Sequence, residues 1–418
     1  MPPKHAGRRS AVKWLASVVV SWLVFVTTAV PAIEATGRLK WFSSTTKLPQ
    51  ADVLEPLLGK LQTDLRVDLR VLLKHEIGPV RFEFDPTVTW SGGDAVQILN
   101  LGGFPLEQRP GSDSLRFFDW SDELIGTADY RVITRVDRLS ASLRQPNWSL
   151  QIGRQAVSWG NGIVFQPLDL FSPFAPTTID REFKPGVDSL LFESLVGQTS
   201  EFQALFIGRQ ESDLAPTAQS HTVALKWTQS IQEIAFDVLV AEHLGNEIVG
   251  FSMTAPVAGA LVRSDVAKSC DEFECTTSGL VNVDYTIAIR QALLYVFGEV
   301  YHNGFGVKDL SEEIPARLTA SLARGEVFTT MQNYASVGTN ITWHPLWSQS
   351  FIVIRNIEDR SGLFQSAVTY DPSDVARIQM GVSWPVGEDN TEFGTNRIDE
   401  ETTAGGNPSL FFSFSRYF

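Results

Sequence analysis

Charged side chains recur at every second position in several stretches of the first half of the chain. In "DLRVDLR" (64–70) and "VRFEFD" (80–85) they alternate with Leu, Val and Phe. An extended strand turns alternate residues to opposite faces, so these charges share one face. They could pair across neighbouring strands, or line a water-filled interior and bind charged solutes, and both interpretations stay open. The candidate pore-lining residues are Arg66, Asp68, Arg70, Arg81, Glu83, Asp85, Arg131, Arg135, Asp137 and Arg154.

Catalytic chemistry finds little support in the sequence. Barrel hydrolases need a hydroxyl nucleophile, a histidine and an orienting partner brought together. The element "YHNG" (301–304) resembles the HxSNG element of outer-membrane phospholipase A, but it lacks the serine. The sequence has no H-E-x-x-H element, no Gly-rich phosphate loop and no repeated acidic calcium loop. We therefore predict no enzyme activity, no metal site and no cofactor.

The only two cysteines, Cys270 and Cys275, lie close together in "SCDEFECTT". Outside the cytoplasm, two neighbouring cysteines in an acidic loop favour a small disulfide. The alternative is a metal-binding pair, but no histidine or second cysteine pair lies near them in sequence. A metal site usually needs more ligands than that, so we predict the disulfide.

Two-residue alternation continues along the whole chain and predicts long strands. Runs of about 9 to 17 residues, with charges of both signs on the polar side, are typical of a barrel with lipid outside and water within. Short links alternate with mostly longer ones, which is the asymmetry of outer-membrane barrels. We predict an all-β fold, a transmembrane antiparallel β-barrel of 16 to 18 strands. The segments are 37–44, 62–73, 79–90, 128–144, 147–158, 188–197, 200–208, 220–228, 232–242, 248–255, 258–266, 279–290, 291–302, 334–344, 349–357, 362–370, 374–384 and 408–418.

The first 35 residues have the layout of a cleaved secretory signal peptide. Four basic residues and no acidic one occupy positions 1–13, an apolar run covers 14–30, and "PAIEA" offers cleavage after Ala32 or Ala35. An uncleaved signal anchor is the alternative. Removal would leave a single barrel domain, 36–418, with 30 basic and 47 acidic residues and a formal charge of −17. That charge makes nucleic acid a poor partner.

The chain ends on an apolar strand, "PSLFFSFSRYF". Leu410, Phe412 and Phe414 share one face of this strand, and Phe418 is the last residue. The ending resembles the C-terminal signature of Gram-negative outer-membrane proteins, although Arg416 stands where that pattern generally has an apolar residue or Tyr. The resemblance implies that the barrel-insertion machinery binds this end through Phe418.

One segment, 147–193, is unlike generic barrel sequence. It resembles a motif of a largely uncharacterised family of Gram-negative porin-like outer-membrane proteins, in which GRQ-x-x-x-WG leads to F-x-P-x-D-x-x-x-P and then to PGVD. Its beginning is also similar to the alginate-export barrels. The resemblance implies a porin-like barrel and leaves the solute unnamed. The matching positions are Gly153, Arg154, Gln155, Trp159, Gly160, Phe165, Pro167, Asp169, Pro173, Asp180, Arg181, Pro185, Gly186, Val187 and Asp188.

The stretch 159–187 within this segment is expected to be a long, stiff loop. Its glycines permit backbone angles that other residues avoid, and four prolines prevent strand pairing. We predict that it folds into the barrel mouth, pairs with wall residues such as Arg154 and narrows the pore. An ordinary extracellular loop packed on its neighbours is the alternative. The constriction candidates are Trp159, Asp169, Asp180, Arg181, Glu182 and Lys184.

Together these patterns favour an outer-membrane channel for passive or substrate-selective passage of small hydrophilic solutes. The expected partners are outer-membrane lipid, such solutes, the insertion machinery and, as an open alternative, further copies in a homo-oligomer. The competing hypothesis is a barrel that serves as scaffold or export partner for another envelope component. A lumen that selects a polyanion would need a surplus of Arg and Lys, and the chain has 34 against 48 acidic residues, which weakens an alginate-export role.

Overall fold

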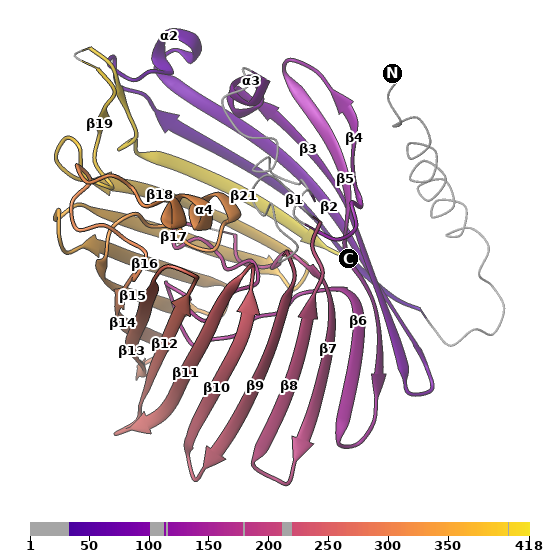
Figure 1. Ribbon diagram of the computed structural model, residues 1–418. Helices are drawn as coiled ribbons and strands as arrows, with labels where there is room; N and C mark the ends of the chain where they lie inside the picture. Colours follow the sequence, from indigo (N-terminus) through magenta and orange to yellow (C-terminus); the bar gives the residue numbers. More distant parts are fainter. Residues whose placement is uncertain (1–32, 101–112, 114–115, 179, 211–219, 400) are drawn as a thin grey trace, which may run out of the picture.

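The computed structural model describes residues 33–100, 113, 116–178, 180–210, 220–399 and 401–418. Within these ranges, 18 antiparallel strands form a closed ring, because β1 (Glu34–Lys47) pairs with both β2 and β21 (Figure 1). The other strands of the ring are β2 (Leu61–Ile77), β3 (Val80–Gly93), β5 (Tyr130–Arg144), β6 (Trp148–Gln155), β7 (Val187–Val196), β8 (Ser200–Ile207), β9 (Thr222–Ile231), β10 (Ile234–His243), β11 (Asn246–Val257), β12 (Ala260–Cys270), β13 (Cys275–Ile289), β14 (Ala292–His302), β15 (Asn333–His344), β16 (Trp347–Asn356), β17 (Gly362–Ser373), β18 (Ala376–Val386) and β21 (Ser409–Tyr417).

Each segment predicted from alternation overlaps one of these strands, so the predicted antiparallel barrel is confirmed at 18 strands rather than 16. The short elements inside the long links were not predicted. β4 (Ser121–Gly126) pairs with β5 above the point where β6 ends, and so covers the edge that β6 leaves free. The others are α2 (Glu55–Leu58), α3 (Asp94–Asn100), α4 (Ala316–Arg324), β19 (Asn396–Arg397) and β20 (Thr403–Ala404).

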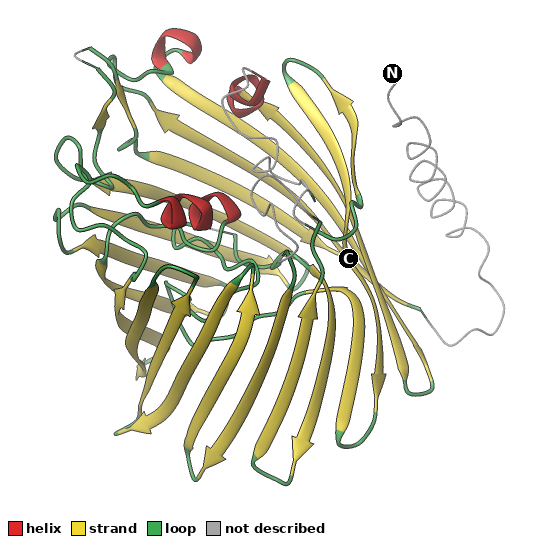
Figure 2. Ribbon diagram, viewed as in Figure 1, coloured by secondary structure: helices red, strands yellow, loops and turns green. Residues whose placement is uncertain are grey.

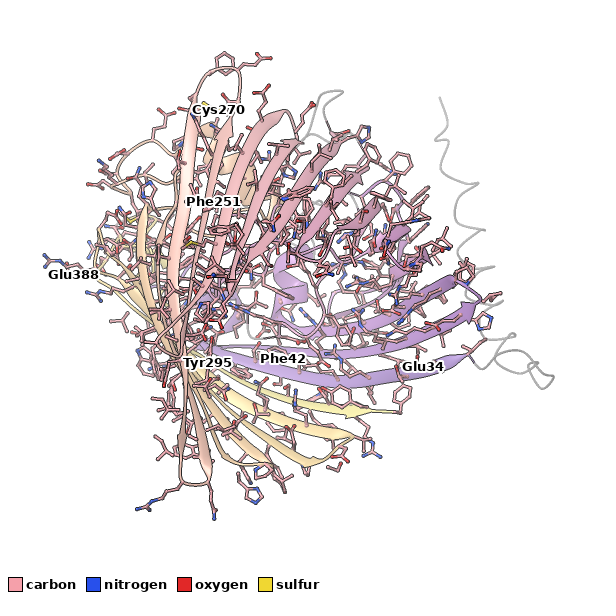
Figure 3. All side chains as sticks on the ribbon, turned by 90° about the horizontal axis from the view of Figure 1, so that it is seen from below. Glu34, Phe42, Phe251, Cys270, Tyr295 and Glu388 are labelled. Atoms are coloured by element: carbon pink, nitrogen blue, oxygen red, sulfur yellow. A yellow bond between two sulfur atoms is a disulfide. The ribbon has the colours of Figure 1, made fainter. Side chains whose placement is uncertain are left out.

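Side chains alternate between the two faces of the ring, as expected of strands. On β2, Arg66, Asp68 and Arg70 line an interior cavity, whereas Leu69 between them is 39% exposed on the outer face. Phe251 of β11, labelled in Figure 3, is likewise 43% exposed on the outer face. The barrel therefore presents an apolar outer surface and a polar inner wall on this side.

The two ends of the barrel differ in their connections. Tight turns join β2 to β3 at Gly78 and β13 to β14 at Arg290, and both turn residues have positive φ (58° and 55°). The longer links and the helices α2 and α3 lie at the opposite end, at the top of Figure 1. We call these the turn end and the loop end. The ring begins and ends at the turn end, because β1 starts there and β21 finishes there.

The interior is not a simple water-filled pore. Two long connections, the inner loop (residues 156–186) and the α4 loop (residues 303–332), pack inside the ring, where Figure 2 shows coil and a helix. Phe171 of the inner loop is completely buried in an apolar cluster with wall residues of β7 to β12. Phe165 stacks on Tyr301 of β14, with ring centroids 4.5 Å apart. Apolar packing therefore fills one side of the lumen.

The described residues contain no helix that is long and apolar enough to cross a membrane. The predicted signal peptide lies almost entirely outside the described residues and stays a prediction. Because β1 begins at Glu34, the alternative cleavage after Ala32 would leave that strand whole.

Candidate functional site

The inner loop crosses the lumen from one wall to the opposite one. On one side, the backbone N–H of Asn161 donates to Asp265 Oδ2 of β12 at 2.7 Å, and the Asn161 side chain contacts Ser252 of β11. On the other side, Asp180 Oδ2 lies 2.7 Å from Lys40 Nζ of β1. In the 18-stranded ring, β11 is the ninth strand from β1 in both directions. The two attachments are therefore diametrically opposed.

A buried carboxylate holds the first attachment. Glu299 of β14 is 2% exposed and accepts backbone N–H groups of Ile163, Val164 and Phe165 at 2.7, 3.1 and 2.9 Å. Asn282 Nδ2 donates a further hydrogen bond to the same carboxylate at 3.1 Å. One carboxylate thus accepts hydrogen bonds from three successive amides. These amides have no strand partner, because the inner loop does not pair with the sheet.

The open part of the lumen is a cavity of about 750 Å³ between the inner loop, the α4 loop and the wall of β1, β2, β3 and β5. Its charged lining is predominantly basic, although the chain as a whole has a formal charge of −14. Six basic and three acidic residues line it: Arg38, Lys40, Arg66, Arg70, Arg135 and Arg324 against Asp68, Asp137 and Asp180. The charged residues that line the cavity therefore have a net formal charge of +3.

Arg38 and Lys40 hold the second attachment of the inner loop. Arg38 Nη2 donates to Asp68 Oδ1 at 2.9 Å, and its Nη1 contacts Glu182 of the loop. The ring of Phe183 lies over the guanidinium groups of Arg38 and Arg70, at 4.7 and 4.3 Å from the ring centroid. Burial alone would raise the pKa of Asp180, but the charges of Lys40 and Arg38 outweigh it and lower that pKa. Asp180 is therefore ionised at neutral pH.

A bulge in β5 brings two charged residues to the inner wall side by side. Asp85 of β3 faces Arg138 and Pro86 faces Val136, so that Asp137 is the extra residue. Asp137 accepts from Arg70 at 2.6 Å and from Arg138 at 3.0 Å. This cluster ties β2 to β5 at the wall of the cavity and keeps Arg70 and Arg138 paired.

The predicted pore-lining residues divide into two groups. Arg66, Asp68, Arg70, Arg135 and Asp137 line the cavity. The side chain of Arg66 is exposed and forms no hydrogen bond or ion pair with the described part of the chain.

The other predicted pore-lining residues lie elsewhere on the inner wall. Arg81 pairs with Glu83 at 3.1 Å near the turn end, and Arg131 pairs with Glu123 of β4 at 2.6 Å. Asp85 is buried, with its Oδ1 unpaired. Strand alternation places them on the inner face without showing which part of that face is open.

For Arg154 the prediction is wrong, because this side chain is fully buried and lines no opening. Its Nε and Nη2 donate to Asp188 at 2.8 and 3.0 Å, its Nη1 contacts Asp113, and its guanidinium lies 4.7 Å from the ring centroid of Trp120. It therefore pairs with β7 and with the link before β4, not with the charged residues of the inner loop. The buried ion pairs make it a structural residue.

The constriction candidates also divide. Asp180 and Glu182 reach the opposite wall, as described above. Trp159 is buried against Phe171 and donates from its indole N–H to Gln203 at 2.8 Å.

The remaining constriction candidates shape the inner loop itself. Lys184 pairs with Asp169, which also accepts a hydrogen bond from Ser158 at 3.0 Å. Arg181 donates to the backbone carbonyls of Ile163 and Pro176 at 3.0 and 2.9 Å. These three candidates, Lys184, Asp169 and Arg181, hold the loop in shape rather than meet the cavity wall.

The sequence reasoning missed Arg38 and Lys40, the two cations that the inner loop contacts. Their alternation with Leu39 and Trp41 carried the same signal as the pattern of β2 and could have identified them. Arg324 and Asp113 were missed for another reason. Both lie in long links, where no periodicity indicates direction.

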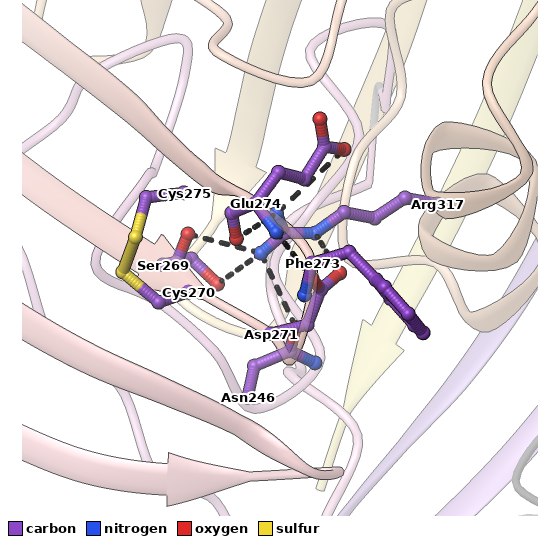
Figure 4. The surroundings of a disulfide bond; sticks show 8 residues. All are labelled: Asn246, Ser269, Cys270, Asp271, Phe273, Glu274, Cys275 and Arg317. Atoms are coloured by element: carbon purple, nitrogen blue, oxygen red, sulfur yellow. Dashed lines mark hydrogen bonds and ion pairs between the residues drawn. A yellow bond between two sulfur atoms is a disulfide. The ribbon is translucent and has the colours of Figure 1, made fainter.

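Cys270 and Cys275 form a disulfide that closes the turn between β12 and β13 at the loop end. Figure 4 shows Arg317 of α4 against this turn. Its Nη2 donates to the carbonyl of Ser269 at 3.0 Å and to Asn246 Oδ1 at 3.2 Å, and its Nε lies 3.4 Å from Asp271 Oδ2. The disulfide-closed turn thus anchors the helix beside the cavity.

No family model and no curated protein matches the sequence, and no group of three or more potential metal ligands occurs in the described ranges. Solved structures do match. The chain is similar to a BenF-like porin from Pseudomonas fluorescens Pf-5, at 10% identity and a TM-score of 0.51, over 93% of this chain and 100% of that one.

Two further structures are similar to the same degree. OccK2 (OpdF) from Pseudomonas aeruginosa has 9% identity and a TM-score of 0.52, over 92% of this chain and 97% of its own. OccAB1 from Acinetobacter baumannii has 11% identity and a TM-score of 0.52, over 92% and 96%. The likeness supports the porin-like barrel expected from the sequence, whereas the motif at 153–188 stays a prediction. At such identities it shows the fold, and the solute has to be argued from the site.

Proposed function

We propose that this protein is an outer-membrane channel for small hydrophilic solutes, with a preference for anions. The observation that carries the proposal is the cavity of about 750 Å³, whose charged lining has six basic and three acidic residues. A barrel of this strand number leaves an aqueous lumen unless loops close it, and here the inner loop leaves an opening along β1, β2, β3 and β5. The apolar outer face would lie against lipid, with the turn end in the periplasm.

Anion preference follows from the positions of the cations. A solute that enters from the loop end meets Arg66, which is exposed and has no partner in the described part of the chain. Arg66 lies opposite Phe42 of β1, and the solute then meets Lys40 and Arg38, two and four residues nearer to the turn end. A crystal structure of OccK2 (OpdF), one of the similar barrels, was solved in complex with glucuronate. Glucuronate, a sugar with one carboxylate, is thus a reasonable first probe of this cavity.

Planar-bilayer recording of the refolded protein tests the proposal. We expect stable single-channel steps, a reversal potential in a KCl gradient that shows anion preference, and concentration-dependent block by glucuronate but not by glucose. A folded barrel that conducts no current, or that prefers cations, would contradict it. The alternative of a scaffold or export partner gains no support from the similar structures, and a silent folded barrel is the result that would revive it.

A further inference from the structure

We propose that Asp180 and Glu182 act as built-in substitutes for a solute carboxylate: they occupy Lys40 and Arg38, and an anionic solute passes by exchanging with them. This inference deepens the proposed channel function and rests on it. It assigns to two residues of the inner loop the role of internal competitors at the anion site, in addition to narrowing the lumen.

The three carboxylates that pair with Arg38 differ in accessibility and in attachment. Asp68 belongs to the neighbouring strand, and its side chain is 17% exposed. Glu182 and Asp180 belong to the inner loop, and their side chains are 31% and 38% exposed. The Arg38 side chain itself is only 5% exposed. A carboxylate that arrives from the cavity can therefore replace the loop partners, while Asp68 stays in place.

Lys40 depends still more on the loop. Its Nζ lies 2.7 Å from Asp180 Oδ2, and the described residues provide no other ion-pair partner for it. If Asp180 turns away, the ammonium becomes available to a solute at the edge of the cavity. The two cations are two residues apart on one face of β1, so a single carboxylate can pass from one to the other.

The loop can release these side chains without unfolding. Arg181 lies between them in sequence, and its guanidinium is bound to the carbonyls of Ile163 and Pro176. After them, the carbonyl of Lys184 accepts a hydrogen bond from Arg138 of β5. In the stretch 180–183 the described contacts with β1 are made by side chains only. Rotation of two side chains therefore suffices, and such motions take picoseconds to nanoseconds at exposed positions.

Exchange of one carboxylate for another also avoids the cost of a bare buried charge. Removing one partner of a buried pair is strongly destabilising, because the other charge is left uncompensated. Here Arg38 keeps Asp68 throughout the exchange, and Lys40 regains a carboxylate partner as soon as the solute binds. The competition lowers the apparent affinity for the solute, since only the fraction of sites that the loop has vacated can bind it. Conduction requires binding that is weak enough to release the solute.

The test compares block by glucuronate in wild type and in D180N/E182Q. The neutral amides compete poorly, so the half-blocking concentration should fall about tenfold and single blocking events should lengthen. E182D keeps the charge but shortens the side chain, and it should shift the half-blocking concentration in the same direction by a smaller factor. E312Q/E313Q removes two exposed carboxylates that do not line the cavity and is the control for net charge, for which we expect no shift.

The outcomes separate this inference from the channel function. An anion-selective wild type with an unchanged half-blocking concentration in D180N/E182Q would overturn the exchange and leave the channel intact. The same tightening in E312Q/E313Q would also overturn it, because the effect would then come from net charge. A wild type that is not anion selective would instead contradict the channel proposal itself. Heat-dependent migration in detergent gels verifies that each variant is folded.

Discussion

The backbone N–H of Ile163, in the inner loop, lies 2.7 Å from the buried carboxylate of Glu299 on β14. With the amides of Val164 and Phe165 on the same group, this contact fixes the loop at the side of the lumen that is packed with apolar residues. The loop is therefore held by a wall carboxylate on one side, whereas on the other side the loop itself supplies carboxylates to wall cations. The two attachments differ in burial and should respond differently to mutation.

We expect E299A to loosen the inner loop. The substitution leaves three N–H groups without an acceptor, and each of the two buried ones, of Val164 and Phe165, costs about 1–3 kcal/mol. The variant should unfold at a lower temperature and give larger, noisier single-channel currents, while E299Q, which keeps one oxygen acceptor, should lie between it and wild type. E242Q removes an exposed carboxylate from β10 and should behave as wild type. Equal stability of E299A and wild type would argue against the anchor.

Replacing residues 161–184 with a short Gly-Ser linker should raise single-channel conductance several-fold, because the inner loop crosses the lumen between β11 and β1. The same change exposes apolar wall residues such as Leu205, Ile207 and Leu280 to water. We therefore also expect lower thermal stability, at about 25 cal/mol for each Å² of apolar area uncovered. A folded variant of unchanged conductance would show that the loop does not restrict the flow of ions.

Arg154 should be among the most destabilising positions to mutate. R154M leaves the buried Asp188 without its ion-pair partner, whereas Asp113 keeps Arg116 and Arg135, and breaking a buried pair in this way costs about 3–5 kcal/mol. Urea unfolding in lipid vesicles measures the loss. The double variant R154M/D188N removes both charges of that pair and should recover part of it. If R154M alone is as stable as wild type, the ion pairs contribute nothing and the buried network has been misassigned.

The strands could be predicted because a membrane barrel requires apolar and polar residues to alternate with a strict period of two. Each strand sequence therefore shows by itself which residues face lipid and which face the lumen. The path of the inner loop could not, because its contacts join residues far apart, such as Asn161 with Asp265 and Ile163 with Glu299. Alternation put Arg154 on the inner face correctly but could not show that the link before β4 covers it. The bulge at Asp137 likewise has no signal in the pattern of β5.

The pH dependence of conduction should be small between pH 8 and pH 5. The pKa of Asp180 is lowered, with the charges of Lys40 and Arg38 outweighing its burial, so this carboxylate stays ionised over that range. A lowered pKa contributes stability that is present above the ordinary Asp value of about 3.9 and is lost as the pH falls through the lowered one. The reversal potential and glucuronate block should therefore change only below about pH 4. A transition near pH 6 would indicate that another group governs the cavity.

The disulfide between Cys270 and Cys275 should control how firmly α4 is held beside the cavity. It closes a six-residue ring, for which chain entropy alone predicts about 2 kcal/mol of stabilisation of the turn. In C270S/C275S the turn that binds Arg317 becomes mobile, and we expect rapid current flicker with little change in mean conductance or in the global unfolding temperature. R317A should produce the same flicker with the disulfide intact, because it removes the hydrogen bonds to Ser269 and Asn246.

The control for this prediction is R290Q, which removes an exposed arginine from a tight turn at the opposite end of the barrel. It should leave the current trace unchanged. Reduction of the wild type with dithiothreitol should reproduce the flicker, and dithiothreitol should have no effect on C270S/C275S. If only the global unfolding temperature falls and the current stays steady, the disulfide supports the barrel as a whole and α4 is held by its packing alone.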